Sequence, residues 1–366
     1  MKLEKLSLLN FKNLARCELD LPSRLTCLVG ENGAGKTNVL DAVHYLSVGR
    51  GAMGLSDAQS VRHGEDFFMV EGSYTSDAGR GEQIVCAYKS GNKTLKRGGK
   101  EYERLSDHLG LVPLVVVFPS DVFLVSDAAE ERRRYLNSFL SQLDRQYLDA
   151  IIRYNNTLAQ RNRLLKEPWA RHTNETLEVL DMQMIEYGER VHDKRAEVIA
   201  RMAPVVAQYY ATLSDDKEQV ELTYRSELSE TPFPELLEQC RERDRVNRFS
   251  TCGVHRDDMV MRIGGLPLKK YGSQGQQKSF LVALKLAQYQ LLKEATGEHP
   301  ILLLDDLFDK LDMHRVERLV HLVAGPDFGQ IFITDCNKLR LEGILERSGE
   351  PYSLFEVADG AITAKQ

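Results

Sequence analysis

A glycine-rich stretch early in the chain carries the clearest chemistry, because it matches the phosphate-binding pattern G-x-x-x-x-G-K-[ST]. Glycines let successive backbone N–H groups point at one anion, since glycine adopts conformations that are closed to residues with a Cβ. Lys36 is then expected on the β- and γ-phosphates of a nucleotide, and the Thr37 hydroxyl on Mg²⁺. The residues expected to hold the nucleotide are Gly30, Glu31, Asn32, Gly33, Ala34, Gly35, Lys36, Thr37 and Asn38.

The sequence on either side of this loop predicts the elements that the motif requires. Residues 25–29 form a short apolar run that is typical of a buried strand, and the apolar residues within 37–46 recur at helical spacing. A helix that begins at the loop directs its free N–H groups and the positive end of its dipole at the phosphates. Strand, loop and helix together favour a nucleotide site over an ordinary glycine-rich turn.

A second group of candidate residues follows an apolar run in the last quarter of the chain. Four apolar residues, 301–304, lead into Asp305 and Asp306, which is the Walker B pattern of a core strand that ends in carboxylates. Asp305 is the expected Mg²⁺ ligand, directly or through water. The predicted cofactors are therefore ATP and Mg²⁺.

Several motifs resemble those of one ATPase superfamily. Residues 10–14 resemble the segment that precedes the loop in ATPase heads of the ABC superfamily, in particular its RecF and SMC branch. Residues 251–258, which end in G-V-H-R-D-D, resemble the RecF-family motif that ends in G-P-H-R-D-D, with Val254 in place of proline. Residues 273–276, with the letters S-Q-G-Q, resemble the ABC signature in its RecF form. The resemblance extends over nearly the whole chain and favours the RecF family.

This resemblance implies a fold and further site residues. The implied fold class is α/β: an ABC-type P-loop ATPase head with a mixed sheet, plus an inserted α-helical arm. Asp306 stands where these ATPases have their general base. Gln59 stands near the loop glutamine that reaches the metal and the attacking water, and a plain surface glutamine is the open alternative. Ser273, Gly275 and Gln276 would form a second phosphate cradle that completes the site of a partner subunit in a dimer.

The resemblance leaves some positions open. Residues 309–312 resemble the D-loop of a dimer interface. Thr334 and Asp335 stand at a strand end where many ABC ATPases carry a histidine that senses the γ-phosphate, so the residue with that role is not identified. His255 and the two aspartates that follow make a poor metal site, because alternate side chains on an extended strand point to opposite faces.

The middle of the chain has helical periodicity. Apolar residues spaced by three and four predict one amphipathic helix over 128–166 and a second that extends through Tyr209, which together form an antiparallel arm. This arm is far shorter than the coiled coil of an SMC protein and favours the RecF family. The predicted domains are 1–127 for the first part of the head, 128–245 for the arm and 246–366 for the second part of the head.

Composition limits the class of protein. Of 366 residues, 42% are hydrophobic, which is enough for a substantial core. The six cysteines are scattered without a C-x-x-C pair, which indicates neither a zinc site nor a disulfide framework. Neither a signal peptide nor a stretch of membrane-spanning length is apparent, so we expect a cytoplasmic protein without a membrane partner.

Any contact with DNA requires locally concentrated positive charge, because the formal net charge is −6. Residues 89–100 hold five cations and no acidic residue on an expected hairpin, and the arm is rich in arginine. Both segments are candidates for binding backbone phosphates, and both are also compatible with an ordinary solvated surface.

Membership of the RecF family would imply an ATP-dependent DNA-binding protein of recombinational gap repair, replication-fork maintenance and the response to DNA damage. It would dimerise with ATP on gapped DNA at single-strand/double-strand junctions, hydrolyse ATP slowly as a DNA-stimulated switch, and help recombinase loading with RecO and RecR. The alternatives are an SMC-like or other ABC-type ATPase that acts as a structural DNA clamp, and a transporter subunit, which the basic helical insert fits poorly.

Overall fold

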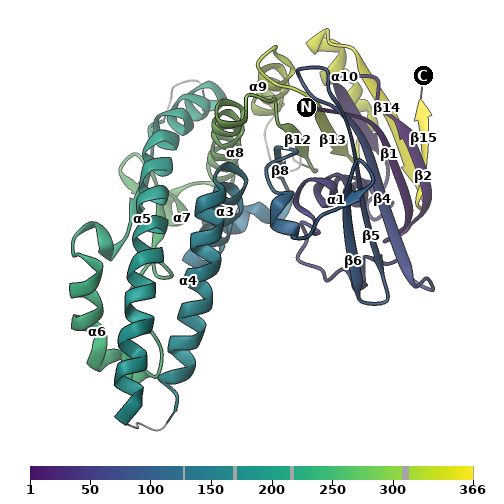
Figure 1. Ribbon diagram of the computed structural model, residues 1–366. Coiled ribbons are helices and arrows are strands. Elements are labelled where there is room, and N and C mark those ends of the chain that lie inside the picture. Colours follow the sequence, from purple (N-terminus) through teal and green to yellow (C-terminus); the bar gives the residue numbers. More distant parts are fainter. Residues whose placement is uncertain (127, 168–170, 215–217, 307–312, 366) are drawn as a thin grey trace. The chain divides into compact units, whose positions relative to one another are not determined.

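The computed structural model describes residues 1–126, 128–167, 171–214, 218–306 and 313–365 (Figure 1). The chain divides into two compact units. The first comprises Met1–Asp121 and Lys285–Gln366, and the second comprises Val122–Leu284. The second unit thus extends to residue 284, whereas the predicted arm ends at residue 245. The three predicted domain boundaries stay predictions.

The first unit contains a six-stranded antiparallel sheet with the order β2-β1-β4-β5-β6-β7. One face of this sheet is buried, so buried and accessible residues alternate along β1 and β4. Residues 89 and 92 pair across the β5–β6 turn, which confirms the hairpin expected there. The strands are β1 (Lys2–Phe11), β2 (Leu14–Asp20), β4 (Phe67–Thr75), β5 (Gly81–Lys89), β6 (Asn92–Arg97) and β7 (Lys100–Glu101).

The second sheet of this unit is mixed and has the order β15-β14-β3-β13-β12-β8. All neighbours are parallel except β14 and β15. β3, β12 and β13 are buried along their whole length, as the apolar runs at 25–29 and 301–304 predict for the first two. The strands are β3 (Leu25–Val29), β8 (Leu114–Val117), β12 (Ile301–Leu304), β13 (Ile331–Asp335), β14 (Tyr352–Ala358) and β15 (Ala361–Lys365).

Helix α1 (Lys36–Val48) joins the two sheets into one core. The core cluster contains residues of α1, of the antiparallel sheet and of the parallel strands, among them Val39, Phe68 and Phe332. α1 ends at Gly49, which adopts the left-handed conformation favoured at helix C-termini. The other helices of this unit are η1 (Ala58–Ser60), η2 (Leu105–Asp107), α9 (Met313–Ala324) and α10 (Lys338–Ser348); η3 (Pro119–Val122) crosses the boundary between the units.

The second unit is built on the antiparallel helices α4 (Arg145–Leu164) and α5 (Arg171–Ser214), which run alongside each other in Figure 1. Their direction follows from their contacts, since Tyr147 meets Arg195 and Arg161 meets Asp181. The single helix predicted over 128–166 is wrong. Two helices, α3 (Ala129–Leu143) and α4, occupy this range, because the Asp144 carboxylate accepts the first free N–H groups of α4 and starts a new helix there.

A small sheet and shorter helices complete the second unit. The sheet has the order β11-β10-β9 and is antiparallel. Helix α8 (Gln274–Thr296) continues from this unit into the first. The remaining elements are α2 (Phe123–Ser126), β9 (Val220–Arg225), η4 (Glu227–Ser229), α6 (Phe233–Asn247), β10 (Asp258–Ile263), β11 (Leu266–Pro267) and α7 (Leu268–Tyr271). Among the described helices of the chain, none is long and apolar enough to cross a membrane.

Candidate functional site

The glycine loop connects the end of β3 to the beginning of α1, as the sequence predicts. Gly35 adopts a φ of 121°, and a Cβ there would lie 2.9 Å from the side-chain amide of Asn13. Asn13 itself donates to the Ala34 carbonyl at 3.0 Å and accepts from the Asn38 side chain at 2.7 Å. These contacts give the motif at residues 10–14 a physical role that sequence reasoning missed. The side chain of Asn13 holds the glycine loop in place through hydrogen bonds.

Lys36 is held over the loop by its own backbone. Its Nζ donates to the carbonyl oxygens of Gly30 and Glu31 at 2.7 and 2.9 Å. The ammonium group is therefore kept beside the cradle of N–H groups, where phosphate oxygens would compete favourably for it because they carry full negative charge.

A cavity of about 140 Å³ opens at the C-terminal ends of β3 and β12. This is the edge of a parallel sheet where ligands bind in open α/β folds. Every described residue that lines it was predicted from the sequence as a nucleotide, metal or catalytic residue. The lining residues are Asn32, Gly33, Gly35, Lys36, Thr37, Asn38, Asp305 and Asp306.

The expected metal ligands meet in this cavity. The Thr37 hydroxyl lies 2.9 and 3.0 Å from the two carboxylate oxygens of Asp305. Hydroxyl and carboxylate oxygens are hard ligands of the kind that Mg²⁺ prefers, so this donor set fits the ion. Burial raises the pKa of Asp305, while hydrogen bonds from Thr334 and Thr37 oppose that rise.

Asp306, the residue after Asp305, has a strained backbone. Its φ is +43°, an uncommon value for a residue other than glycine. Its N–H donates to the Thr334 hydroxyl at 2.9 Å. The Oδ1 atom of Asp306 is buried and finds no hydrogen-bond partner among the described residues. This oxygen of Asp306 lies beside the phosphate cradle and has an acceptor position left for a proton from water, as a general base needs.

At the strand end that the sequence left open, the buried Asp335 pairs with the partly exposed Arg340. Arg340, on the first turn of α10, donates to the Asp335 carboxylate at 2.8 and 3.1 Å. Oxygen and sulfur atoms of Asp306, Asp335 and Cys336 lie within 4.8 Å of one another. Because Arg340 already neutralises Asp335, we do not assign a second metal to this cluster. The D-loop residues 309–312 lie outside the described residues.

Gln59 lies in η1 and is exposed. Its Oε1 accepts from the backbone N–H and the hydroxyl of Ser56 at 3.0 and 2.9 Å. It is not one of the described residues that line the cavity. Its assignment as a catalytic residue stays a prediction.

The signature residues lie at the beginning of α8 in the second unit. Ser273 Oγ accepts from the Gln276 N–H at 3.2 Å, and Gln276 Oε1 accepts from the Ser273 N–H at 2.6 Å, which is a capping box. Gly275 is part of the first helical turn, and Ser273 is exposed. The Ser273 hydroxyl proton is not used by the capping box and can be donated to an anion. The role of Ser273, Gly275 and Gln276 in binding a nucleotide stays a prediction.

The H-R-D-D motif is a structural joint of the second unit. Arg195 of α5 donates to the Val254 carbonyl and to the Asp257 carboxylate at 2.7 and 3.1 Å. Both ring nitrogens of His255 form hydrogen bonds, to Tyr154 at 2.8 Å and to the Ser250 carbonyl at 3.0 Å. These nitrogens are therefore not available to a metal.

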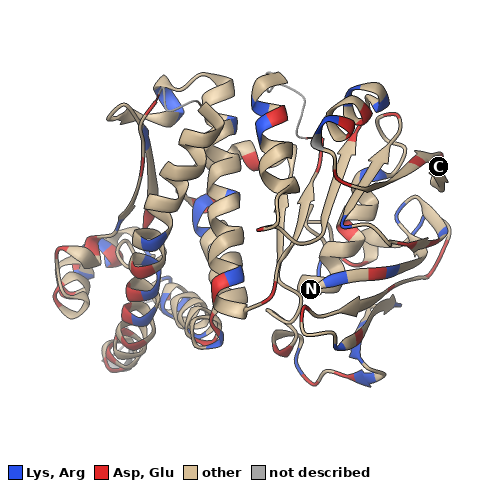
Figure 2. Cartoon of the chain, turned by 90° about the horizontal axis from the view of Figure 1, so that it is seen from above, with Lys and Arg blue, Asp and Glu red and all other residues tan. Residues whose placement is uncertain are grey.

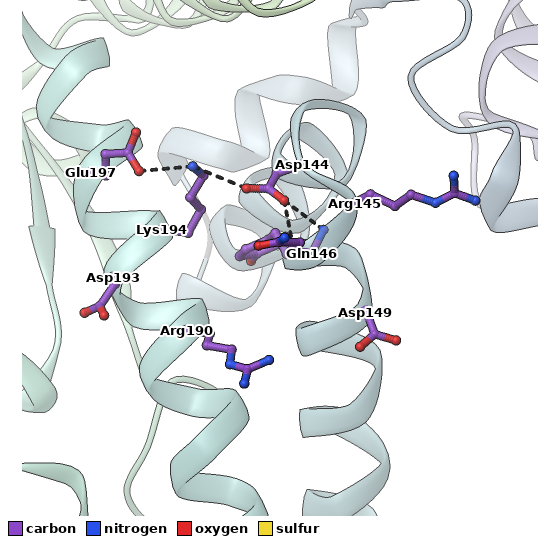
Figure 3. A pocket seen from close by; sticks show the side chains of 9 residues that line it. Asp144, Arg145, Gln146, Asp149, Arg190, Asp193, Lys194 and Glu197 are labelled. Atoms are coloured by element: carbon purple, nitrogen blue, oxygen red, sulfur yellow. Dashed lines mark hydrogen bonds and ion pairs between the residues drawn. The ribbon is translucent and has the colours of Figure 1, made fainter.

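A second cavity, of about 780 Å³, lies between the start of α4 and the middle of α5 (Figure 3). Lys194 bridges Asp144 and Glu197 at its rim, as the dashed lines show. Four carboxylates and three cations line the cavity. This charge balance does not suit a polyphosphate, so the nucleotide site remains the loop.

Comparison with known proteins identifies the fold and the family. Residues 1–108 match the AAA ATPase domain family. Head domains of Smc proteins share the fold: one from Pyrococcus yayanosii superposes with a TM-score of 0.61 at 14% identity, over 100% of this chain and 96% of that one. Two structures of the recombination mediator protein RecF in the RecFOR pathway, RecF-ATPrS and RecF-ATP, superpose with TM-scores of 0.89 and 0.87. Both are 28% identical and cover 100% of this chain and 98% and 97% of theirs.

Fold and cavity together define the class as a P-loop ATPase head of the type found in RecF, and Smc heads share its fold. The chain is 46% identical to the DNA replication and repair protein RecF of Phocaeicola vulgatus, over 100% of this chain and 99% of that protein. It is 42% identical to RecF of Flavobacterium johnsoniae, over 98% and 100%. The chain therefore belongs to the RecF family.

Proposed function

We propose that the chain is an ATP-dependent DNA-binding protein of recombinational gap repair and replication-fork maintenance, which uses weak, DNA-stimulated ATP hydrolysis as a switch. Membership of the RecF family supports the biological role. The observation that carries the biochemical role is the convergence of Lys36, Thr37, Asp305 and Asp306 on one cavity at the end of the parallel strands.

In the proposed site, the loop N–H groups and Lys36 bind the β- and γ-phosphates, and Thr37 and Asp305 hold Mg²⁺. Mg²⁺ supplies positive charge that neutralises the phosphate oxygens when it is bound. Asp306 orients the attacking water and accepts its proton, for which its buried Oδ1 is free among the described residues. Gln59 would assist the water only after its side chain leaves Ser56.

The proposed switch is a homodimer in which Ser273 of a second copy meets the γ-phosphate. Ser273 suits this role because it is exposed at the N-terminus of a long helix, where an anion is favoured. Each surface that would meet the other copy also exposes a large apolar side chain. Tyr271, two residues before Ser273, is 54% exposed, and Leu339, beside Arg340, is 81% exposed.

The proposed DNA substrate is gapped duplex with a single-strand/double-strand junction, and the proposed protein partners are RecR- and RecO-type mediators in the cytoplasm. Figure 2 shows Lys and Arg interspersed with Asp and Glu along the helices of the second unit. Arg134 and Arg153, for example, pair with carboxylates on their own helices. The arm is thus less available to DNA than its arginine content implies. Lys89, Lys93 and Arg97 of the β5–β6 hairpin also pair with carboxylates, so the hairpin is a candidate through Lys96 and Lys100, which form no ion pair within the described residues.

The direct test is ATP hydrolysis by the purified chain with and without gapped duplex DNA. We expect slow hydrolysis that requires Mg²⁺ and increases with DNA, and its loss in Lys36→Ala. Turnover that persists in Lys36→Ala would contradict the assigned site. ATP and DNA binding by the original chain without any turnover would instead favour the non-hydrolysing clamp.

A further inference from the structure

Thr334, the fourth residue of β13, joins the two Walker B carboxylate residues through one hydroxyl group. Its Oγ1 donates to Asp305 Oδ1 at 2.7 Å and accepts from the Asp306 N–H at 2.9 Å. Thr334 is fully buried, so no water competes for these bonds. The hydroxyl has a single proton, which is donated to Asp305, and one of its two lone pairs accepts the Asp306 N–H.

The bond to the Asp306 N–H fixes a strained peptide. A left-handed backbone is unfavourable for a residue with a side chain, so Asp306 needs a compensating contact to keep its φ of +43°. This φ decides where the Asp306 carboxylate points. Thr334 supplies the contact from a strand that is the direct neighbour of β12.

The bond to Asp305 acts on the metal side of the site. Asp305 accepts from only two side chains among the described residues, Thr37 and Thr334. Thr37 is itself an expected metal ligand. Thr334 is therefore the partner that can orient Asp305 without binding the metal. Groups that orient metal-binding carboxylates in this way typically change metal affinity or activity by about 10–100-fold when they are removed.

We propose that Thr334 is a positioning residue that sets the metal-binding carboxylate of Asp305 and the general base of Asp306 relative to each other. This inference rests on the proposed ATPase function. In this chain a buried hydroxyl that is not among the described residues lining the cavity, rather than a histidine, would link the end of β13 to the chemistry. The alternative is that Thr334 merely satisfies buried polar groups in the sheet.

The chain offers a matched control at Thr26 on β3, the other neighbour of β13. Thr26 is also fully buried, and its hydroxyl has no hydrogen-bond partner in the described part of the chain. Thr26→Val and Thr334→Val thus make the same chemical change in adjacent strands. Thr334→Ser keeps the hydroxyl and tests rescue. Thr334→Ala lacks the hydroxyl without adding bulk, and replaces the valine variant if that does not fold.

The experiment measures Mn²⁺ affinity in the presence of a non-hydrolysable ATP analogue by electron paramagnetic resonance, alongside single-turnover hydrolysis. We expect Thr334→Val to weaken Mn²⁺ binding about tenfold or more and to slow hydrolysis about 10–100-fold. Binding of the analogue in EDTA should change less than about twofold, because the loop and Lys36 are untouched. Thr334→Ser should restore both properties, and Thr26→Val should resemble the original chain.

Normal Mn²⁺ affinity and hydrolysis in Thr334→Val would overturn the inference. So would equal losses in Thr26→Val, or a failure of Thr334→Ser to recover, because either result would point to general disturbance of the sheet. If the original chain does not hydrolyse ATP at all, the proposed function fails. The Mn²⁺ titration then still decides whether Thr334 positions Asp305.

Discussion

The Arg195 guanidinium donates to the Asp257 carboxylate at 3.1 Å, and both side chains are only 2% exposed. The Tyr224 hydroxyl donates to the same carboxylate, and Arg195 also donates to Asn137 on α3 at 2.9 Å. One charged pair thus connects α3, α5, β9 and the segment before β10. The family motif around Asp257 is explained by this joint rather than by contact with a substrate.

Removal of Asp257 should destabilise the second unit strongly. Asp257→Ala leaves the buried Arg195 charge without its carboxylate, and breaking a buried pair in this way costs about 3–5 kcal/mol. The free energy of unfolding in urea measures the effect. Glu186→Ala removes an exposed pair with Arg190 and should cost less than about 1 kcal/mol. Similar small losses in the two variants would refute the structural role of the joint.

The stability of the chain should fall as the pH drops below 6.5, partly because of His255. Burial lowers the pKa of His255 to about 4, and nearby Arg256 and Arg133 act in the same direction. Its ordinary pKa in the unfolded chain is about 6.5, so between pH 6.5 and 4 the unfolded state binds a proton that the folded state does not. This linkage removes up to about 3 kcal/mol by pH 4.

The measurement is the free energy of unfolding against pH for the original chain and for His255→Gln. The variant should show a smaller slope between pH 6.5 and 4, whatever its stability at neutral pH. His44 and His108, whose pKa values burial also lowers, contribute equally to both proteins. Parallel curves would show that His255 takes up its proton as easily in the folded chain as in the unfolded one.

Local sequence predicted the strands and the residues that line the cavity. It did not predict the hydrogen bonds that position those residues. Apolar runs predicted β3 and β12. The loop and Asp305 follow the ends of these two strands and therefore lie at one edge of the sheet. The break at Asp144 was missed because Leu140, Leu143 and Tyr147 keep helical spacing across it, and only a side-chain cap marks the new helix. The role of Thr334 depends on contacts with a strand that is distant in sequence, and the role of Arg340 depends on how the chain turns between β13 and α10, and no spacing rule predicts either.

Charge reversal in the β5–β6 hairpin should weaken DNA binding without affecting ATP binding. Within the described parts of the chain, Lys96 and Lys100 form no ion pair, whereas Lys93 is paired with Asp57 at 2.8 Å. We expect Lys96→Glu with Lys100→Glu to make the plot of log affinity against log salt shallower by about one for each phosphate that the hairpin no longer neutralises. Fluorescence anisotropy with labelled gapped duplex at several salt concentrations measures this slope.

The control for this experiment is Lys5→Glu with Lys365→Glu, which changes the net charge equally at lysines that already pair with Glu18 and Glu356. This variant should keep nearly the original salt dependence. An equal reduction of the slope in both double variants would mean that DNA responds to overall charge and not to the hairpin. Loss of ATP binding together with DNA binding would indicate misfolding.

In the proposed dimer, Ser273 of one copy completes the site that holds ATP in the other copy. The most direct test is the molar mass, by sedimentation, of Asp306→Asn with saturating ATP and Mg²⁺, since blocked hydrolysis should trap the closed state. We predict a stable dimer that returns to monomer when Ser273→Glu is added, because the new carboxylate faces the γ-phosphate. A monomer at saturating ATP, or a dimer indifferent to both ATP and Ser273→Glu, would contradict a nucleotide site shared between two copies.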